Sequence, residues 1–142
     1  LALPEARLLE RVERLRTLPF FSFMTDEQLV AVARIAAETY TSVGTYLCRQ
    51  GQLGQELFIV LKGEIEIIRR VEGGRVVLKA REGQVVGESA ILADTPRTAD
   101  LRALTNVHLL VISGVQFRAL IRQHAEIAEN VIRHLVTKLE IS

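Results

Sequence analysis

The sequence has few cysteines, no long apolar run and almost no net charge, and each of these features excludes a class of protein. It has one cysteine in 142 residues, so an internal disulfide cannot form, and we expect a reducing, cytoplasmic setting. Its apolar runs, such as residues 57–61 and 109–112, are far shorter than the ~20 residues that span a bilayer, so we expect no membrane insertion. Lysines and arginines number 18 against 17 acidic residues. Because no net field attracts a polyanion, we expect no direct binding of nucleic acid.

Motifs typical of enzymes are also missing. The sequence shows no P-loop, nucleophile motif or pair of catalytic carboxylates. The three histidines, His108, His124 and His134, lie in segments of different pattern, so their convergence on one metal ion is not expected. Cys48 has no histidine at a recognisable spacing and is expected to be a small residue of the core or its rim. The sequence predicts a protein that is not an enzyme and holds no metal.

The residues that are present predict one domain, residues 1–142. Hydrophobic residues make up 49% and charged residues 25%, a balance that supports a sizeable core. The length is about that of a single domain, which typically has ~100–150 residues. Because the chain opens at Leu1 rather than Met, we expect it to be cut from a longer polypeptide whose effector domain is absent.

The N-terminal part, residues 1–39, is predicted to be helical. Apolar residues recur at helical spacing over residues 5–18. Thr25 and Gln28 then form the two ends of a capping box, which predicts a second helix that reaches about Glu38.

The middle part, residues 40–112, has the pattern of β-structure. Glycines separate short runs of β-branched and aliphatic residues, which is typical of a barrel or jelly roll. Residues 72–75 predict a hairpin turn. Residues 87–92 show no alternation, so we expect a short helix there. The predicted fold is mainly β with flanking α: a double-stranded β-helix, or jelly-roll-like β-roll, between N-terminal and C-terminal helices.

The C-terminal part, residues 113–142, is again predicted to be helical. A second capping box at residues 113–116 predicts a helix to about Arg122. A last helix over residues 125–139 carries a broad apolar stripe. The stripe consists of a row at every fourth residue with further apolar residues beside it: Ile127, Val131, Leu135 and Leu139, flanked by Ala128, Ile132 and Val136. It is broader than the roll needs, so we expect part of it to make another contact, as a lid or as a weak homodimer seam.

The segment 87–99 has the residues expected of an anion-binding site. Backbone N–H groups at the start of a short helix form an anion site, and Gly87 permits close backbone approach. Arg97 can grip phosphate oxygens with two donors. Glu88 would repel a phosphate but can accept from a sugar hydroxyl, so the set suggests a nucleotide. On spacing alone the alternative is an ordinary surface ion pair between Glu88 and Arg97.

Two tetrapeptides, Gly87-Glu88-Ser89-Ala90 and Pro96-Arg97-Thr98-Ala99, resemble a known motif. They are similar to the phosphate-binding cassette of the cyclic nucleotide-binding domain family. This family includes the bacterial catabolite activator protein, protein kinase A regulatory subunits and cyclic-nucleotide-gated channels. The resemblance extends to residues 18–21, 54–60 and 62–65 and to the closing helices.

The resemblance implies a binding site made of Gly87, Glu88, Ser89, Ala90, Arg97, Thr98 and Ala99. In it, the N–H groups near Ser89 and Ala90 hold the cyclic phosphate, Arg97 neutralises it and Glu88 takes the ribose 2′-hydroxyl. Thr98 lies near phosphate and purine and does not decide between bases. The residue that caps the purine is not identified.

The resemblance also implies a function. We expect a regulatory or sensor module that binds cAMP, with cGMP as the alternative ligand, and relays occupancy through its C-terminal helices to the effector domain of the parent chain. Gly54 and Gly63 match roll turns and are expected to be structural. Two alternatives stay open: a pseudo-receptor roll that contacts proteins without binding nucleotide, and a cupin-like metal enzyme, which would need more metal ligands than His108.

Overall fold

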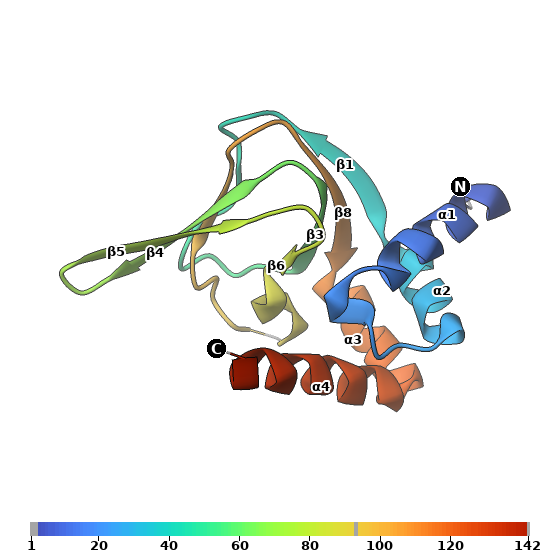
Figure 1. Cartoon of the computed structure of the whole chain (residues 1–142). Coiled ribbons are helices and arrows are strands. Elements are labelled where there is room, and N and C mark those ends of the chain that lie inside the picture. Colours follow the sequence, from blue (N-terminus) through green and yellow to red (C-terminus); the bar gives the residue numbers. More distant parts are fainter. Residues whose placement is uncertain (1–2, 93, 142) are drawn as a thin grey trace. The chain divides into compact units, whose positions relative to one another are not determined.

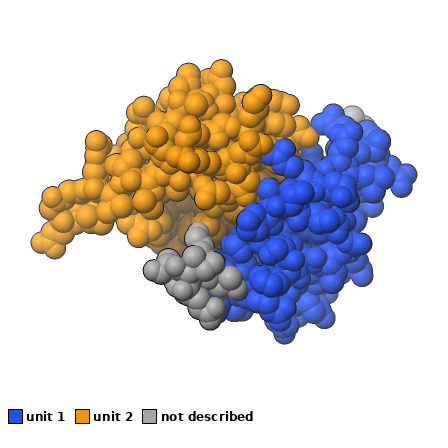
Figure 2. All heavy atoms as spheres, viewed as in Figure 1, with its two compact units in different colours: residues 1–36, 116–142 blue, residues 37–115 orange. Residues whose placement is uncertain are grey.

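The chain divides into two compact units. The computed structural model describes residues 3–92 and 94–141, apart from the side chains of residues 137–141 (Figure 1). One unit is helical and comprises residues 1–36 and 116–142, and the other comprises residues 37–115 (Figure 2). No helix of the described residues is both long and apolar enough to span a bilayer.

The helical unit begins as its apolar spacing predicts. Helix α1 (Glu5–Arg16) buries one face, and a 3-10 turn, η1 (Pro19–Phe21), follows it. The capping box is confirmed: the Gln28 N–H donates to Thr25 Oγ1 at 3.2 Å, and the Thr25 N–H donates to Gln28 Oε1 at 3.1 Å. Helix α2 (Asp26–Ile35) ends before Glu38, because strand β1 begins at Ala37. The predicted boundary between residues 39 and 40 therefore lies three residues too late.

The last helix, α4 (Ala125–Ile141), is confirmed, and the inner part of its apolar stripe is covered. Ile127 and Val131 are buried. Near them, the His134 ring lies edge-on to Phe20 of η1, with centroids 5.3 Å apart. These residues explain much of the stripe by packing within the helical unit.

The apolar residues that α4 exposes are those flanking the main row of the stripe. Ile132 is 59% exposed and Val136 is 47% exposed. Leu135 is half-buried, and the side chain of Leu139 lies outside the described residues. A contact of α4 with something else would therefore use Ile132 and Val136.

The second unit is a β-roll, and the expected fold class is confirmed. Its described residues form eight strands in two antiparallel sheets, in the orders β1-β8-β3-β6 and β2-β7-β4-β5. The strands are β1 (Ala37–Thr41), β2 (Tyr46–Cys48), β3 (Glu56–Lys62), β4 (Ile65–Val71), β5 (Gly74–Ala80), β6 (Val85–Val86), β7 (Asp100–Ala103) and β8 (Val107–Ser113). The predicted hairpin is confirmed, but its turn is shorter than residues 72–75: Val71 pairs with Gly74, so β5 already begins at Gly74. Helix α3 (Gly114–Gln123) follows β8.

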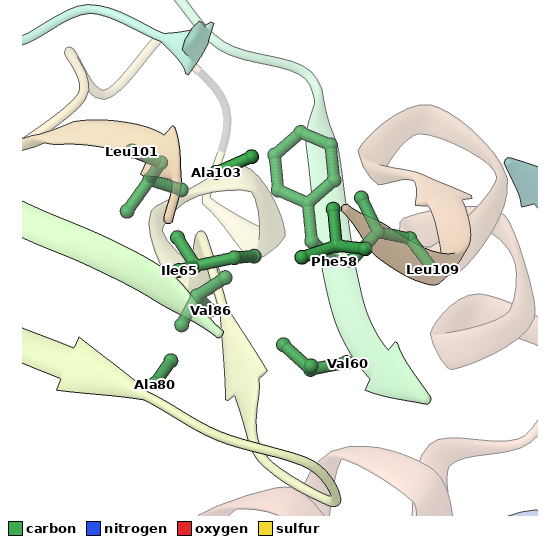
Figure 3. Packing of buried hydrophobic residues seen from close by; sticks show 9 residues of the cluster. Phe58, Val60, Ile65, Ala80, Val86, Leu101, Ala103 and Leu109 are labelled. Atoms are coloured by element: carbon green, nitrogen blue, oxygen red, sulfur yellow. The ribbon is translucent and has the colours of Figure 1, made fainter. Parts of the chain in front are cut away.

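The roll encloses its own apolar core, which supports the segment between β6 and β7. Side chains from both sheets form this core (Figure 3). They are Phe58, Val60, Ile65, Ala80, Val86, Leu101, Ala103, Val107 and Leu109. The predicted short helix is present as a 3-10 turn, η2 (Glu88–Ile91), directly after β6. The segment 87–99 therefore connects two strands, β6 and β7, that both contribute side chains to this core.

Candidate functional site

Gly87 makes the sharp turn from β6 into η2. Its φ is 81°, in the left-handed region that side chains disfavour. A Cβ at this position would also lie 2.9 Å from the Glu56 carbonyl oxygen and 2.8 Å from Nη1 of Arg97. The groups that approach the Gly87 backbone in this structure are Arg97 and the Glu56 carbonyl.

The turn η2 leaves fewer free N–H groups than the sequence suggested. The Ala90 N–H donates to the Gly87 carbonyl at 3.0 Å, so this expected phosphate donor is engaged within the turn. Ala90 is fully buried, whereas Ser89 is half-buried. Among the described residues, no acceptor meets the N–H groups of Glu88 and Ser89. These two groups are the donors that remain for an anion.

Backbone hydrogen bonds fix Arg97 to the segment before β3. The Arg97 N–H donates to the Gln52 carbonyl at 2.7 Å, and the Gly51 N–H donates to the Arg97 carbonyl at 2.8 Å. Next to them, Leu53 and Pro96 form an isolated β-bridge. The sequence does not show this attachment, because the two segments lie more than 40 residues apart.

The Arg97 side chain is buried and poorly satisfied. The residue is 4% exposed, and its guanidinium lies 5.6 Å from the centre of the Phe58 ring. Nη1 donates to the Gly87 carbonyl at 3.3 Å, whereas Nε is buried and meets no acceptor in the described part of the chain. No carboxylate of the described residues pairs with Arg97, so the ion pair with Glu88 does not form. Burying an uncompensated charge costs several kcal/mol in general, so this arginine needs an anion.

A second arginine has an unpartnered Nε, but it lies elsewhere. Arg102 on β7 has a buried Nε without an acceptor among the described residues. It follows Leu101, which points into the roll core, so by strand alternation Arg102 lies on the opposite face of the sheet. Arg102 therefore does not contribute to the site at residues 87–99, and Arg97 is the arginine of that site.

Glu88 is the other charged residue of the site without a partner. Its side chain is half-buried and has no hydrogen bond or ion pair among the described residues. Thr98 is exposed, and Ala99 is buried. The sequence placed these residues in one site, and the structure keeps them on the single segment between β6 and β7.

Cys48 lies at the edge of the roll core, beside this segment. Its thiol donates to the Ala99 carbonyl at 3.7 Å. Burial raises the pKa of the Cys48 thiol, although Arg97 acts in the opposite direction. The thiol is therefore mainly protonated at neutral pH, which agrees with the expectation of a core or rim residue.

Sequence reasoning missed Asp100, the first residue of β7. This carboxylate is 1% exposed and accepts from the Gln50 N–H at 2.7 Å and from Arg70 Nη1 at 2.6 Å. Arg49 Nε lies 3.5 Å away. Burial raises the pKa of Asp100, but these donors and charges outweigh it and hold the pKa below its ordinary value. The sequence does contain a signal for this residue. Asp100 stands between the apolar residues Ala99 and Leu101, and a carboxylate buried in such a strand needs hydrogen-bond or charged partners.

Gly54 also differs from its expected role. Gly63 does occupy a turn, with φ 97°, whereas the φ of Gly54 lies outside the left-handed region. A Cβ at Gly54 would instead overlap the side chain of Arg97. No local sequence signal reports this contact.

Another group of polar residues lies on β1 and β8. His108 Nε2 is 3.0 Å from Glu38 Oε2, and the His108 ring stacks on Tyr40 at 4.3 Å between centroids. An open depression of about 630 Å³ adjoins them. Within residues 3–92 and 94–141, no three His, Cys, Asp or Glu side chains gather closely enough to hold a metal ion.

Comparison with known proteins identifies relatives of the whole roll. The family profile of the cyclic nucleotide-binding domain matches residues 38–124. The cGMP-dependent protein kinase egl-4 of Caenorhabditis elegans is 30% identical over 122 residues, which cover 86% of this chain and 15% of that kinase. This chain therefore spans about a sixth of that relative.

Two solved structures show the same fold. The regulatory domain of Toxoplasma gondii PKA with cAMP superposes with a TM-score of 0.72 at 25% identity, over 82% of this chain and 45% of that one. The Thermus thermophilus catabolite activator protein gives a TM-score of 0.74 at 27% identity, over 86% of this chain and 58% of that one.

Proposed function

This chain belongs to the cyclic nucleotide-binding domain family, and from that premise we propose that it is a regulatory module that binds a cyclic nucleotide at residues 87–99. It acts in the cytoplasm without catalytic activity of its own. The proposal extends the family assignment to a ligand, a set of contacts and an output.

One observation carries the proposal: the buried guanidinium of Arg97. Among the described residues, its Nε has no acceptor and no carboxylate balances its charge. The backbones of Gly54 and Gly87, which lack side chains, form walls beside it. A cyclic phosphate has one negative charge and several acceptor oxygens, so the residues present fit this group. A roll used only for protein contacts would have no need for such a cation.

The remaining contacts follow from which polar groups are unsatisfied. The N–H groups of Glu88 and Ser89 donate to the phosphate together with Arg97. The Glu88 carboxylate accepts from the ribose 2′-hydroxyl, which keeps its charge away from the phosphate. Thr98 follows Arg97 in the chain, and its side chain is exposed. In the proposed complex it contacts the phosphate and the purine.

We expect cAMP to bind at least as tightly as cGMP. Toxoplasma PKA was solved with cAMP, which supports this order, whereas the nematode relative is named a cGMP-dependent kinase. cGMP is therefore the second candidate ligand. A direct comparison of the two dissociation constants decides, and tenfold tighter binding of cGMP would reverse the order.

Thermal melting with and without ligand tests the proposal. At ligand ~100-fold above Kd, linkage adds ~2.7 kcal/mol, which raises the melting temperature of a domain of this size by roughly 5–10 °C. Adenosine, which lacks the phosphate, is the matched control and should give a much smaller shift. Unchanged melting with millimolar cAMP and with millimolar cGMP would favour the pseudo-receptor.

The output of the module is an effector domain in the parent chain, reached through the C-terminal helices. Ligand binding biases one packing of α4, and the effector senses it. Hydrogen exchange tests this relay: saturating nucleotide should slow exchange in residues 125–139 as well as in residues 87–99. Protection confined to residues 87–99 would refute the relay. Exposed Ile132 and Val136 supply a modest seam for a weak homodimer.

A further inference from the structure

Gly54 stands where the side chain of Arg97 needs room. A Cβ built on Gly54 would overlap Nε, Cζ and Cδ of Arg97. The φ of Gly54 lies outside the left-handed region, so the backbone at this position does not itself require glycine. What the glycine supplies is space for the guanidinium.

The other contacts of Arg97 define where its guanidinium lies within that space. Nη1 donates to the Gly87 carbonyl, and a Cβ on Gly87 would lie 2.8 Å from the same nitrogen. The Phe58 ring lies 5.6 Å from the guanidinium carbon. The guanidinium therefore has two glycine backbones and one ring as neighbours, and a methyl group on Gly54 would displace it from all of them.

We propose that Gly54 is a positioning residue, whose missing side chain sets where the Arg97 guanidinium lies and thereby the affinity for a cyclic phosphate. For its ligand, this inference rests on the proposed function. The overlapping atoms Cδ, Nε and Cζ all belong to a side chain and none to the backbone, so an alanine moves the guanidinium and leaves the backbone in place. The positively charged group then lies away from the Glu88 and Ser89 N–H groups.

The test compares two glycine-to-alanine variants. Gly54→Ala introduces the overlap, whereas Gly74→Ala is the matched control, because Gly74 has open space and a φ outside the left-handed region. Both changes reduce the freedom of the unfolded chain, and the overlap at Gly54 is relieved by a side chain alone, so both melting temperatures should stay within roughly 4 °C of the parent chain. If both variants stay folded, a loss of binding in Gly54→Ala does not come from unfolding.

A double-mutant cycle measures whether Gly54 acts through Arg97. Gly54→Ala should weaken cAMP or cGMP binding at least tenfold, and Gly74→Ala less than twofold. Added to Arg97→Ala, Gly54→Ala should change the affinity less than twofold. Equal losses with and without Arg97 would show a general distortion of the site and overturn the proposal.

A second readout needs no nucleotide. The Arg97 Nε–H group is buried, so its NMR cross-peak, assigned by its loss in Arg97→Ala, should exchange slowly with water in the parent chain and in Gly74→Ala. In Gly54→Ala this exchange should be at least tenfold faster. Unchanged exchange in Gly54→Ala would overturn the positioning role. If the parent chain binds no cyclic nucleotide, the proposed function fails, and the exchange measurement alone still decides the position of Arg97.

Discussion

Arg97 and Asp100 lie three residues apart, and both are buried charged side chains of the roll. Asp100 accepts from the Gln50 N–H and from Arg70, and Arg49 lies near it. Arg97 donates one long hydrogen bond to a carbonyl and has no carboxylate partner among the described residues. One charge is satisfied within the chain, and the other is not.

This difference separates a structural charge from a binding one. A buried charge whose partners all come from the same chain stabilises the fold, and its removal leaves those partners unsatisfied. A buried charge without a partner costs stability, and a ligand of opposite charge recovers that cost on binding. Replacing each residue should therefore affect opposite properties of the protein.

Arg97→Ala should give the largest effect, and it should appear in binding. Cyclic nucleotide affinity should fall by ~2–5 kcal/mol, because the phosphate charge loses its partner in a partly desolvated site. The free energy of unfolding should not decrease by a comparable amount. Calorimetry and chemical denaturation measure the two quantities, with Arg75→Ala on exposed β5 as the control. Affinity within threefold of the parent chain would remove Arg97 from the site.

Glu88 extends the comparison to an acidic group without a partner. 2′-Deoxy cAMP should bind more weakly than cAMP by ~1.5–3 kcal/mol, because it lacks the hydroxyl that donates to the carboxylate. Glu88→Gln should narrow this gap. Competition binding of the two nucleotides to both chains measures it, and equal affinities in the parent chain would refute the sugar contact.

Asp100→Asn should show the opposite pattern to Arg97→Ala. The free energy of unfolding should fall by about 2 kcal/mol, since charged hydrogen bonds from Gln50 and Arg70 weaken together. Binding should fall less than tenfold in the folded fraction. Urea denaturation measures the first quantity, and a variant as stable as the parent chain would show that the Asp100 contacts are dispensable.

The same carboxylate should produce a small dependence of stability on pH. The pKa of Asp100 is lowered in the folded state, so its contribution is complete above the ordinary carboxyl pKa near 3.8. It is lost as pH falls through the lower folded value. Melting curves from pH 5 to pH 2 should therefore decline less in Asp100→Asn than in the parent chain. Parallel declines would contradict the shift.

The sequence predicted what depends on local pattern. The capping box at Thr25, the hairpin between β4 and β5 and the short helix after Gly87 each follow from residue preferences within a few positions. The position of Arg97 against Gly54 and the partners of Asp100 could not be predicted, because they join segments that are distant in the chain. The end of α2 was placed too late for a related reason: pairing of β1 with β8 outweighs the helical pattern.

Calorimetric titration of the chain with cAMP and with cGMP tests the central claim most directly, since that claim is that the unpartnered charge of Arg97 is there to bind a cyclic phosphate. The account predicts saturable binding of at least one of the two with a stoichiometry near one, and no comparable heat with adenosine. Absence of binding by both nucleotides at millimolar concentration would contradict it.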